Sequence, residues 1–586
     1  MLPPLLMLLL LLPRALPFRP PPSSFPRSLE RSLERTPVHP LPRSFHSAPP
    51  LLAKPKSPYA ASVILPSTTF SQRADAVSRE PALQRLWSGL PAKLSAARAG
   101  EPKFTLHDGP PYANGLLHIG HALNKILKDV INRRELLKGK DVAYVPGWDC
   151  HGLPIELKVL QGMKQKERQE LTPPTLRKKA AEFAREAVAA QSESFQRYGV
   201  FGSFDEPYLT LDKSFEAAQI EVFGAMFAAG HIYRGRKPVH WSPSSRTALA
   251  EAELEYPPEH FSRSVYVKFP LAELSGSPDL LGHGDAALAV WTTTPWTMPA
   301  NLAVAVGADI EYAVATSPET GKIVVASDLL PALAEKLALP APFDTLATFP
   351  GSSLVGCSYS HPLYPRLSPV LAGGDYITTE SGTGLVHTAP GHGVEDYQTG
   401  LKAGLELLSP VDDAGKFTSE AGERFEGMSV LGDGNGEVIK ALGEEGALLL
   451  EEKYKHKYPY DWRTKKPTIF RATSQWFASV EGFRDEALAA VKEVKWVPAA
   501  GENRIRSFVE GRSDWCISRQ RSWGVPIPVF YDSLGEPLIT GETIAHIAEV
   551  FREHGSDAWF TMGVEELLPP GLRDRAAGLT KGTDTM

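Results

Sequence analysis

Length, composition and charge restrict the classes of protein that this chain can belong to. Its 586 residues are enough for about three or four domains, and a hydrophobic fraction of 42% supports large buried cores. The 62 basic and 68 acidic residues give a net charge of −6, so local basic patches would have to bind any nucleic acid. The 3 cysteines are far apart, which argues against a disulfide framework and a cysteine-built zinc site.

The N-terminal segment, residues 1–56, differs from the rest of the chain. An apolar run from Leu5 to Leu12 precedes arginines, serines and many prolines, and no acidic residue occurs before Glu30. A secretory signal would carry its positive charge before the apolar run, and a membrane span needs about 20 apolar residues. We therefore expect a transit peptide, a mature protein in the mitochondrial matrix, and no association with a membrane.

Residues 103–131 have the pattern of a strand, a glycine-rich turn and a helix. Lys103 to His107 alternates apolar and polar residues, and five later apolar residues recur at helical spacing. These five are Leu123, Ile126, Leu127, Val130 and Ile131. Strand, turn and helix form the unit of nucleotide-binding α/β sheets. A further strand at Asp141 to Val145 predicts a second unit of a Rossmann-like domain.

Two histidines, His118 and His121, lie in the first turn of the predicted helix. Their spacing puts both on one face, close to backbone N–H groups at the positive end of the helix dipole. Gly115 and Gly120 leave room for an anion to approach the backbone, so the motif predicts a phosphate site. On these residues alone, a helix-capping histidine and half of a zinc site remain open.

Two changes in composition divide the chain into parts. Residues 171–230 have a helical pattern with mixed charge, whereas a stretch from about 265 to 450 is rich in Val, Thr, Gly and Pro. Short apolar runs in that stretch predict a β-rich domain at residues 265–452. We expect this domain to be inserted between two halves of an α/β domain, residues 57–264 and residues 453–586.

Four motifs resemble those of one enzyme family. Pro110 to His121 resembles the HIGH signature of class I aminoacyl-tRNA synthetases. Gly147 to Glu156, Tyr458 to Pro467 and Asp514 to Pro528 resemble the motifs of the isoleucyl-tRNA synthetases within this class. The resemblance extends from about residue 80 to the last residue. It implies a Rossmann-like catalytic domain that is interrupted by a β-rich editing domain.

The resemblance also implies a reaction. ATP and isoleucine would form isoleucyl-adenylate and pyrophosphate, with Mg²⁺ on the phosphates, and the acyl group would pass to tRNA(Ile). His118 and His121, together with Gly115 and Gly120, would bind the ATP phosphates and stabilise charge that develops on the phosphorus oxygens.

Three further residues match positions that bind the amino acid in the family. Asp149 would hold the α-ammonium group, and Pro110 and Trp523 would shape the apolar pocket for the isoleucine side chain. Without the resemblance, Asp149 is equally typical of a turn or cap aspartate, and Trp523 is typical of a core residue.

A second, hydrolytic site follows from the same resemblance, because an apolar pocket rejects a side chain one methylene smaller by only about 1–3 kcal/mol. Trp291 to Asn301 and Gly382 to Tyr397 resemble the two halves of the family's editing pocket. Hydroxyl groups of Thr292, Thr293 and Thr294 would bind the terminal adenosine and the attacking water. Asp396 would bind the α-ammonium group of valine, His387 would exclude isoleucine by size, and Trp296 would form a wall of the pocket. By themselves, the threonines are also typical of a strand and His387 of a structural residue.

The sequence also predicts whether the protein binds zinc, which partners it has and how much of a synthetase it contains. Ser242, Ser244 and Ser245 stand where some relatives carry cysteines and zinc, so we predict no zinc. ATP, isoleucine and tRNA(Ile) are the expected partners of a monomer. Residues 581–586 resemble the opening of a longer family motif, and neither the KMSKS loop nor an anticodon-binding domain follows. We therefore expect a truncated synthetase with impaired ligation, and the alternative is a stand-alone aminoacyl-tRNA deacylase.

Overall fold

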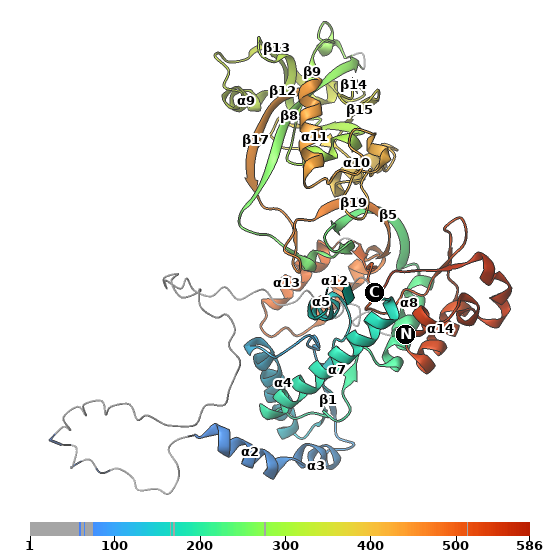
Figure 1. Cartoon of the computed structure of the whole chain (residues 1–586). Helices are drawn as coiled ribbons and strands as arrows, with labels where there is room; N and C mark the ends of the chain where they lie inside the picture. The colour runs from blue at the N-terminus through green and yellow to red at the C-terminus, as the bar shows by residue number, and fades with distance from the viewer. Residues whose placement is uncertain are drawn as a thin grey trace.

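The computed structural model describes residues 74–586 except 165, 168, 169, 275, 276 and 513, together with Pro58, Tyr59, Ser62 and Ile64. The predicted transit peptide, residues 1–56, lies outside the described residues. The described chain is a mixture of helices and strands in an elongated arrangement, with a β-rich part at the top of Figure 1 and most helices below. Among the described residues, no helix combines the length and apolar composition that crossing a bilayer requires.

The N-terminal part contains the predicted strand, turn and helix. Its elements are α2 (Ala76–Trp87), α3 (Leu90–Ala97), β1 (Lys103–Thr105), α4 (Ile119–Leu137), β2 (Asp141–Ala143), β3 (Gly147–Trp148), α5 (Leu153–Gly162), α7 (Pro173–Arg197), β4 (Tyr208–Leu209) and α8 (Lys213–Ala228). β1 pairs with β2 and β3 pairs with β4, in both cases in parallel. The strand at Lys103, the helix that begins at the histidines, and the strand at Asp141 confirm the predicted α/β units.

The buried face of α4 is polar, which the apolar spacing of its sequence did not indicate. Its buried residues are Ala122, Lys125, Asp129, Asn132 and Glu135. The five apolar residues at helical spacing are exposed. Asp108 pairs with Lys125 and Lys128, and Asp129 accepts a hydrogen bond from the backbone N–H of Phe201 at 2.8 Å. Polar partners from distant segments therefore decide which face of α4 packs inward.

The β-rich part is built on a ten-stranded sheet. Its strands are β8 (His260–Glu273), β9 (Ala287–Thr292), β10 (Ala303–Val306), β11 (Glu311–Ser317), β12 (Gly321–Ala326), β13 (Asp344–Pro350), β14 (Ser358–Ser360), β15 (Leu367–Ala372), β16 (Leu385–Thr388) and β17 (Leu448–His456). Its helices are α9 (Leu330–Lys336), α10 (Val394–Lys402) and α11 (Asp433–Glu444).

Six of these strands close into a barrel. The strand order runs β9, β16, β10, β15, β14, β8, and β8 also pairs with β9. Side chains of the large hydrophobic cluster, such as Val267, Leu288 and Val304, pack against one another in this part. β8 and β17 are antiparallel, with His260 opposite His456, so the chain enters and leaves the barrel at adjacent points. An insertion needs this arrangement of chain ends.

Two long strands connect the β-rich part with the helices below it. β5 (Ile232–Ser242) and β19 (Ile469–Ala478) pair antiparallel along their length and lie between the two parts in Figure 1. The remaining elements are β6 (Thr247–Leu249), β7 (Leu254–Glu255), β18 (Tyr460–Asp461), α12 (Arg484–Glu493), α13 (Gly501–Glu510), β20 (Trp515–Cys516), β21 (Phe530–Tyr531), β22 (Pro537–Leu538), α14 (Gly541–His554), α15 (Ala558–Thr561), α16 (Val564–Leu567) and β23 (Thr580–Lys581). α8 and α14 pack together over a second core that contains Phe223, Trp476 and Phe551.

Candidate functional site

The two histidines of the first motif cap α4. His118 is the N-cap residue, and its Nδ1 accepts a hydrogen bond from the backbone N–H of Gly120 at 3.0 Å. Nδ1 of His121 accepts a hydrogen bond from the backbone N–H of His118 at 3.2 Å, and the two ring centres are 3.9 Å apart. The structure therefore gives both histidines the capping role that the sequence left open.

Capping is compatible with phosphate binding, because it uses only one nitrogen of each ring. A neutral imidazole whose Nδ1 accepts a hydrogen bond carries its proton on Nε2 and is a donor there. A Cβ atom at Gly120 would lie 2.9 Å from Cε1 of His118, and Gly115 has φ 146°, so both glycines are needed for this geometry. Two N–H donors at the positive end of a helix suit an anion.

A buried ion-pair network holds the loop before α4 in place. The Asp108 carboxylate pairs with Lys125 and, at 2.8 Å, with Lys128. It also accepts a hydrogen bond from the backbone N–H of Gly147 at 3.1 Å. Burial alone would raise the pKa of the Asp108 carboxyl group, but the two lysines outweigh burial and hold this pKa below its ordinary value. The network joins the histidine helix to the strand that leads to Asp149.

The predicted amino-acid-binding residues lie on neighbouring segments. The backbone N–H of Asp149 donates to the carbonyl of Pro111 at 2.9 Å, which puts Asp149 beside the loop that contains Pro110. Nε1 of Trp523 donates to the carbonyl of Cys150 at 2.8 Å. Pro110 and Asp149 are half-buried and Trp523 is buried. The structure thus brings the segments that contain these three residues next to one another.

Gln191 on α7 supports the same loop, although the sequence analysis did not single it out. Its Oε1 accepts a hydrogen bond from Nε1 of Trp148 at 3.0 Å. Its Nε2 donates to the carbonyls of Tyr112 at 3.0 Å and Gly115 at 2.7 Å. Gln191 continues the buried stripe of Ala180, Ala184 and Ala187. Gln191 acts through contacts that only the fold brings together, so no local pattern in the sequence singled it out.

Arg177, at the other end of that stripe, orients the segment around Trp523. The guanidinium group is buried and donates to the carbonyls of Ser522 at 2.8 Å and Gly524 at 2.7 Å. It also donates to Oγ of Ser556 at 2.6 Å. Arg177 therefore connects α7 with two segments of the C-terminal part.

The predicted editing residues gather at the carboxyl ends of two parallel strands. β9 ends at Thr292 and β16 ends at Thr388, with Val386 opposite Trp291. The hydroxyl oxygens of Thr292 and Thr294 are 3.2 Å apart. Thr292 is buried, and both Thr293 and Thr294 are half-buried.

His387 lies at this strand end with both ring nitrogens occupied. Nε2 is 2.8 Å from Oγ1 of Thr297, and Nδ1 is 2.8 Å from Nδ2 of Asn301. Oγ1 of Thr297 donates to the carbonyl of Thr294 at 2.8 Å, which joins the threonine run to His387. Burial lowers the pKa of His387 to about 3, so the ring is neutral.

Asp396 completes the cluster from the first turn of α10. Its Oδ2 accepts a hydrogen bond from the backbone N–H of Ala389 at 2.8 Å, two residues beyond His387. Burial raises the pKa of the Asp396 carboxyl group to about 7. A carboxylate that is costly to ionise gains most from a cationic partner, and the α-ammonium group of an aminoacyl ester is such a partner.

Trp296 packs beside this cluster. Its ring is buried and meets the ring of His392 edge to face, with ring centres 5.0 Å apart. Asn435, which lies in none of the predicted motifs, accepts a hydrogen bond from the backbone N–H of Trp296 at 2.9 Å. The structure brings the six predicted editing residues to one end of the barrel.

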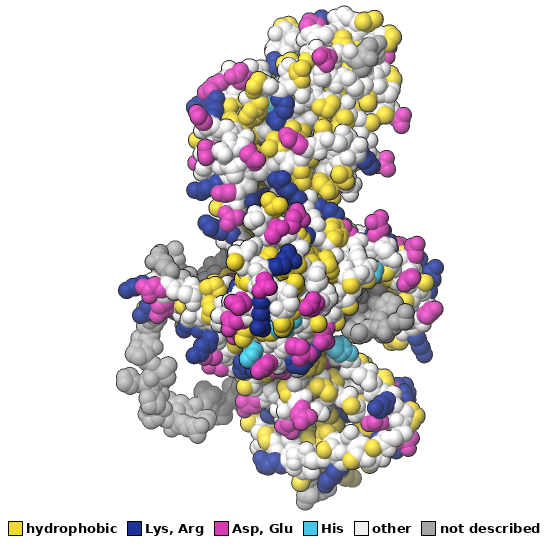
Figure 2. Space-filling view, turned by 90° about the vertical axis from the view of Figure 1, so that its right-hand side faces the viewer, with side chains coloured by type: hydrophobic (Ala, Val, Ile, Leu, Met, Phe, Trp, Pro, Cys, Tyr) yellow, Lys and Arg dark blue, Asp and Glu magenta, His cyan; other side chains and the backbone are white. Residues whose placement is uncertain are grey.

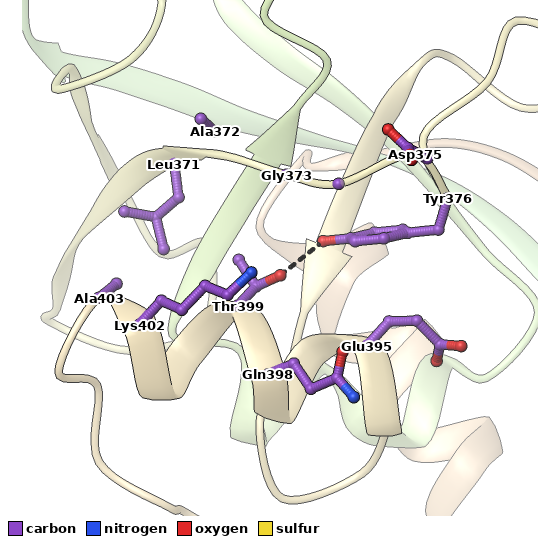
Figure 3. A pocket seen from close by; sticks show the side chains of 11 residues that line it. Leu371, Ala372, Gly373, Asp375, Tyr376, Glu395, Gln398, Thr399, Lys402 and Ala403 are labelled. Carbon is purple, nitrogen blue, oxygen red and sulfur yellow. Dashed lines mark hydrogen bonds between the residues drawn. The ribbon is translucent and has the colours of Figure 1, made fainter. Parts of the chain in front are cut away.

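A pocket of about 410 Å³ lies on α10 between this helix and residues 371–376 (Figure 3). The hydroxyl oxygens of Tyr376 and Thr399 are hydrogen-bonded across the pocket at 3.0 Å. Asp375, Glu395 and Lys402 also line it. None of the predicted site residues lines this pocket. This pocket is therefore lined by residues other than those of the two predicted sites, which are defined by the chemistry of their side chains.

Ser242, Ser244 and Ser245 form a hydrogen-bonded cluster beside Asp461. Its buried carboxylate accepts from the hydroxyl groups of Ser242 at 2.8 Å and Ser245 at 2.5 Å. Oγ of Ser244 is 2.7 Å from Oγ1 of Thr464. Within the part of the chain that the structure describes, no group of three or more metal-ligating side chains is assembled.

Acidic and basic side chains are interspersed over the face shown in Figure 2. This distribution agrees with the small net charge of −6. Any contact with a nucleic acid on this face would depend on individual basic residues.

Similarity to known proteins identifies the class to which the chain belongs. Residues 88–586 match the family of class I tRNA synthetases (I, L, M and V). The chain belongs to this family, which confirms the predicted fold class, a class I synthetase with mixed α/β structure.

The curated relatives reported next are isoleucine–tRNA ligases. The isoleucine–tRNA ligase of Nostoc punctiforme is 60% identical over 540 residues, which are 90% of this chain and 56% of the relative. The isoleucine–tRNA ligase of Thermosynechococcus vestitus is 60% identical over 537 residues, again 90% of this chain and 56% of the relative. The chain thus spans about half the length of the curated relatives it matches.

Solved structures are more distant. A ternary complex of Agrobacterium radiobacter K84 LeuRS with tRNA and LeuAMS matches with 17% identity over 88% of this chain and 58% of that chain, at a TM-score of 0.35. Similarity at this level is too low to relate individual elements.

Proposed function

We propose that this protein is an isoleucine–tRNA ligase that activates isoleucine with ATP, transfers it to tRNA(Ile), and hydrolyses misacylated Val-tRNA(Ile). The observation that carries the proposal is the arrangement of the capping histidines, Asp149 and Trp523 on adjoining segments of a class I synthetase. The names of the relatives support the choice of isoleucine.

In the activation site, binding and charge stabilisation are the tasks of this chain's residues. Nε2–H groups of His118 and His121 donate to phosphate oxygens of ATP, and Mg²⁺ arrives with the nucleotide. Asp149 binds the α-ammonium group, which orients the carboxylate of isoleucine toward the α-phosphorus. That carboxylate attacks phosphorus, the bond to pyrophosphate breaks, and the N–H donors stabilise the charge that develops on the oxygens.

In the editing site, the reaction is hydrolysis of an ester. Asp396 binds the α-ammonium group of the misattached valine, and hydroxyl groups of Thr292 to Thr294 hold the terminal adenosine and a water molecule. The water oxygen adds to the ester carbonyl carbon, the bond to the ribose oxygen breaks, and the ribose oxygen takes up a proton. His387 limits the space available to the amino-acid side chain.

Binding of isoleucine tests the assignment of Asp149. Titration calorimetry of the full chain is expected to show isoleucine binding that Asp149→Asn weakens by about tenfold or more, because a hydrogen bond to a charged group is worth about 1.5–3 kcal/mol. Asp141→Asn, on β2, is the matched control and should bind as the unchanged protein does. Equal binding by both variants would remove Asp149 from the site.

The mitochondrial matrix, the monomeric state and the absence of zinc belong to the same proposal. Fusion of residues 1–56 to a fluorescent protein tests the location, and delivery to mitochondria is expected. Delivery to another compartment would contradict the mitochondrial location.

A further inference from the structure

The amide group of Asn301 has a single possible orientation. Its Nδ2 lies 2.9 Å from the carbonyl oxygen of Ala303 and 2.8 Å from Nδ1 of His387, and its Oδ1 lies 2.5 Å from the hydroxyl of Tyr359. The Ala303 carbonyl only accepts, so the Asn301 atom that faces it must be the donor. The second N–H of Nδ2 then points at His387.

This orientation fixes the tautomer of His387. Nδ1 accepts from Asn301, so the ring proton must be on Nε2. Nε2–H donates to Oγ1 of Thr297, and the Thr297 hydroxyl donates in turn to the Thr294 carbonyl. Each donor in this series of hydrogen bonds meets one acceptor. Both nitrogens of the His387 ring therefore form a hydrogen bond, Nδ1 as acceptor and Nε2 as donor.

An imidazole in this state acts sterically, through the space that its ring fills. His387 is buried, and burial lowers its pKa to about 3, so the ring stays neutral and has no nitrogen available to take a proton from water. The two hydrogen bonds also prevent rotation of the ring about its χ2 angle. The space that remains for the amino-acid side chain therefore depends on how firmly Asn301 holds the ring.

Tyr359 is the first residue of this hydrogen-bond series, before Asn301 and His387. It lies on β14, two strands away from β10 in the barrel order, and its side chain is fully buried. Its ring packs edge to face on Phe269, with centres 5.1 Å apart, which aims the hydroxyl at Asn301. The Tyr359 hydroxyl is the donor that Oδ1 of Asn301 meets. Loss of this hydroxyl would leave a buried carbonyl oxygen without its donor, and the amide would then be held through Nδ2 alone.

We propose that Tyr359 is a positioning residue that sets the specificity of ester hydrolysis, because its hydroxyl fixes Asn301 and Asn301 fixes the His387 ring. The inference rests on the proposed editing function. It adds to that function Tyr359, a residue from a strand without any predicted motif.

Tyr359→Phe tests the inference in the full chain. Hydrolysis rates are measured for Val-tRNA(Ile) and for correctly charged Ile-tRNA(Ile). Hydrolysis of Ile-tRNA(Ile) is expected to rise by about three- to tenfold, the range that one net hydrogen bond supports, while hydrolysis of Val-tRNA(Ile) stays nearly constant. A general loss of folding would lower both rates together.

Tyr266→Phe is the matched control. Tyr266 is equally buried, lies on the neighbouring strand β8, and its hydroxyl interacts with Lys336 instead of Asn301. The ratio of the two hydrolysis rates should not change in this variant. If it changes as much as in Tyr359→Phe, or in neither variant, the positioning role is wrong. If the unchanged protein hydrolyses neither ester, the editing function itself fails and the inference with it.

A spectroscopic measurement gives a readout besides activity. With ¹⁵N-labelled histidine, and His387→Gln to assign the signal, His387 is expected to show an unprotonated Nδ1 and a protonated Nε2. Tyr359→Phe should broaden or shift these signals, and Tyr266→Phe should leave them in place. A protonated Nδ1 in the unchanged protein would overturn the inference.

Discussion

At the residue scale, Asp396 makes the stability of the protein depend on pH. The ordinary pKa of its carboxyl group is 3.8, and burial raises it to about 7 in the folded chain. Between these values the folded state holds a proton that the unfolded state has lost, so stability rises as the pH falls from 7 toward 4. Above pH 7 the ionised carboxylate destabilises the fold.

Removal of this charge should therefore stabilise the protein in mild alkali. Near pH 8, Asp396→Asn is expected to raise Tm by about 2–4 °C, which corresponds to about 1 kcal/mol once solvent screening of this half-buried group is allowed for. Near pH 5 the gain should be less than half as large. Calorimetry at both pH values measures it, with the neighbouring exposed Glu395→Gln as control. A gain that does not depend on pH would contradict the raised pKa.

At the element scale, the polar buried face of α4 is the feature that substitutions can test most directly. Lys125 is almost fully buried against the Asp108 carboxylate, and the rings of Trp148 and Phe195 surround its ammonium group. Removing one partner of a buried pair leaves the other charge without compensation, at a cost of about 3–5 kcal/mol.

Lys125→Met should consequently lower Tm strongly, and Asp108→Asn in the same chain should restore part of the loss. Lys138→Met is the matched control, because Lys138 is a half-exposed lysine at the end of the same helix that pairs with Glu135. Its cost should stay below about 1 kcal/mol. Equal effects of the two lysine variants would show that the buried pair does not hold α4.

The same helix shows what the sequence could predict. Apolar spacing after His121 predicted a helix, and the helix is present, but the side that packs inward follows from Asp108, Tyr144 and Phe201, which no local pattern connects with it. The candidate site residues lie in continuous motifs and could be predicted by resemblance. Gln191 and Tyr359 could not, since each acts through a contact made by the fold.

At the scale of the whole molecule, the β-rich part has the features of an independent folding unit. Its six-stranded ring has no open edge between β9 and β8, and its entry and exit at His260 and His456 are adjacent. The excised segment from about residue 258 to 458 is expected to fold and to unfold cooperatively on heating, as followed by circular dichroism. A gradual transition without a midpoint would show that this part needs the α/β part for its stability.

The central claim is that the segments around His121, Asp149 and Trp523 form a site that activates isoleucine. Isoleucine-dependent exchange of pyrophosphate into ATP by the full chain tests this claim most directly. We expect exchange with isoleucine, weaker exchange with valine, and a loss of about 100-fold or more in His121→Ala. His554→Ala, which alters an exposed histidine at the end of α14, should leave the exchange unchanged. Absence of exchange from the folded chain, or exchange that His121→Ala leaves intact, would contradict it.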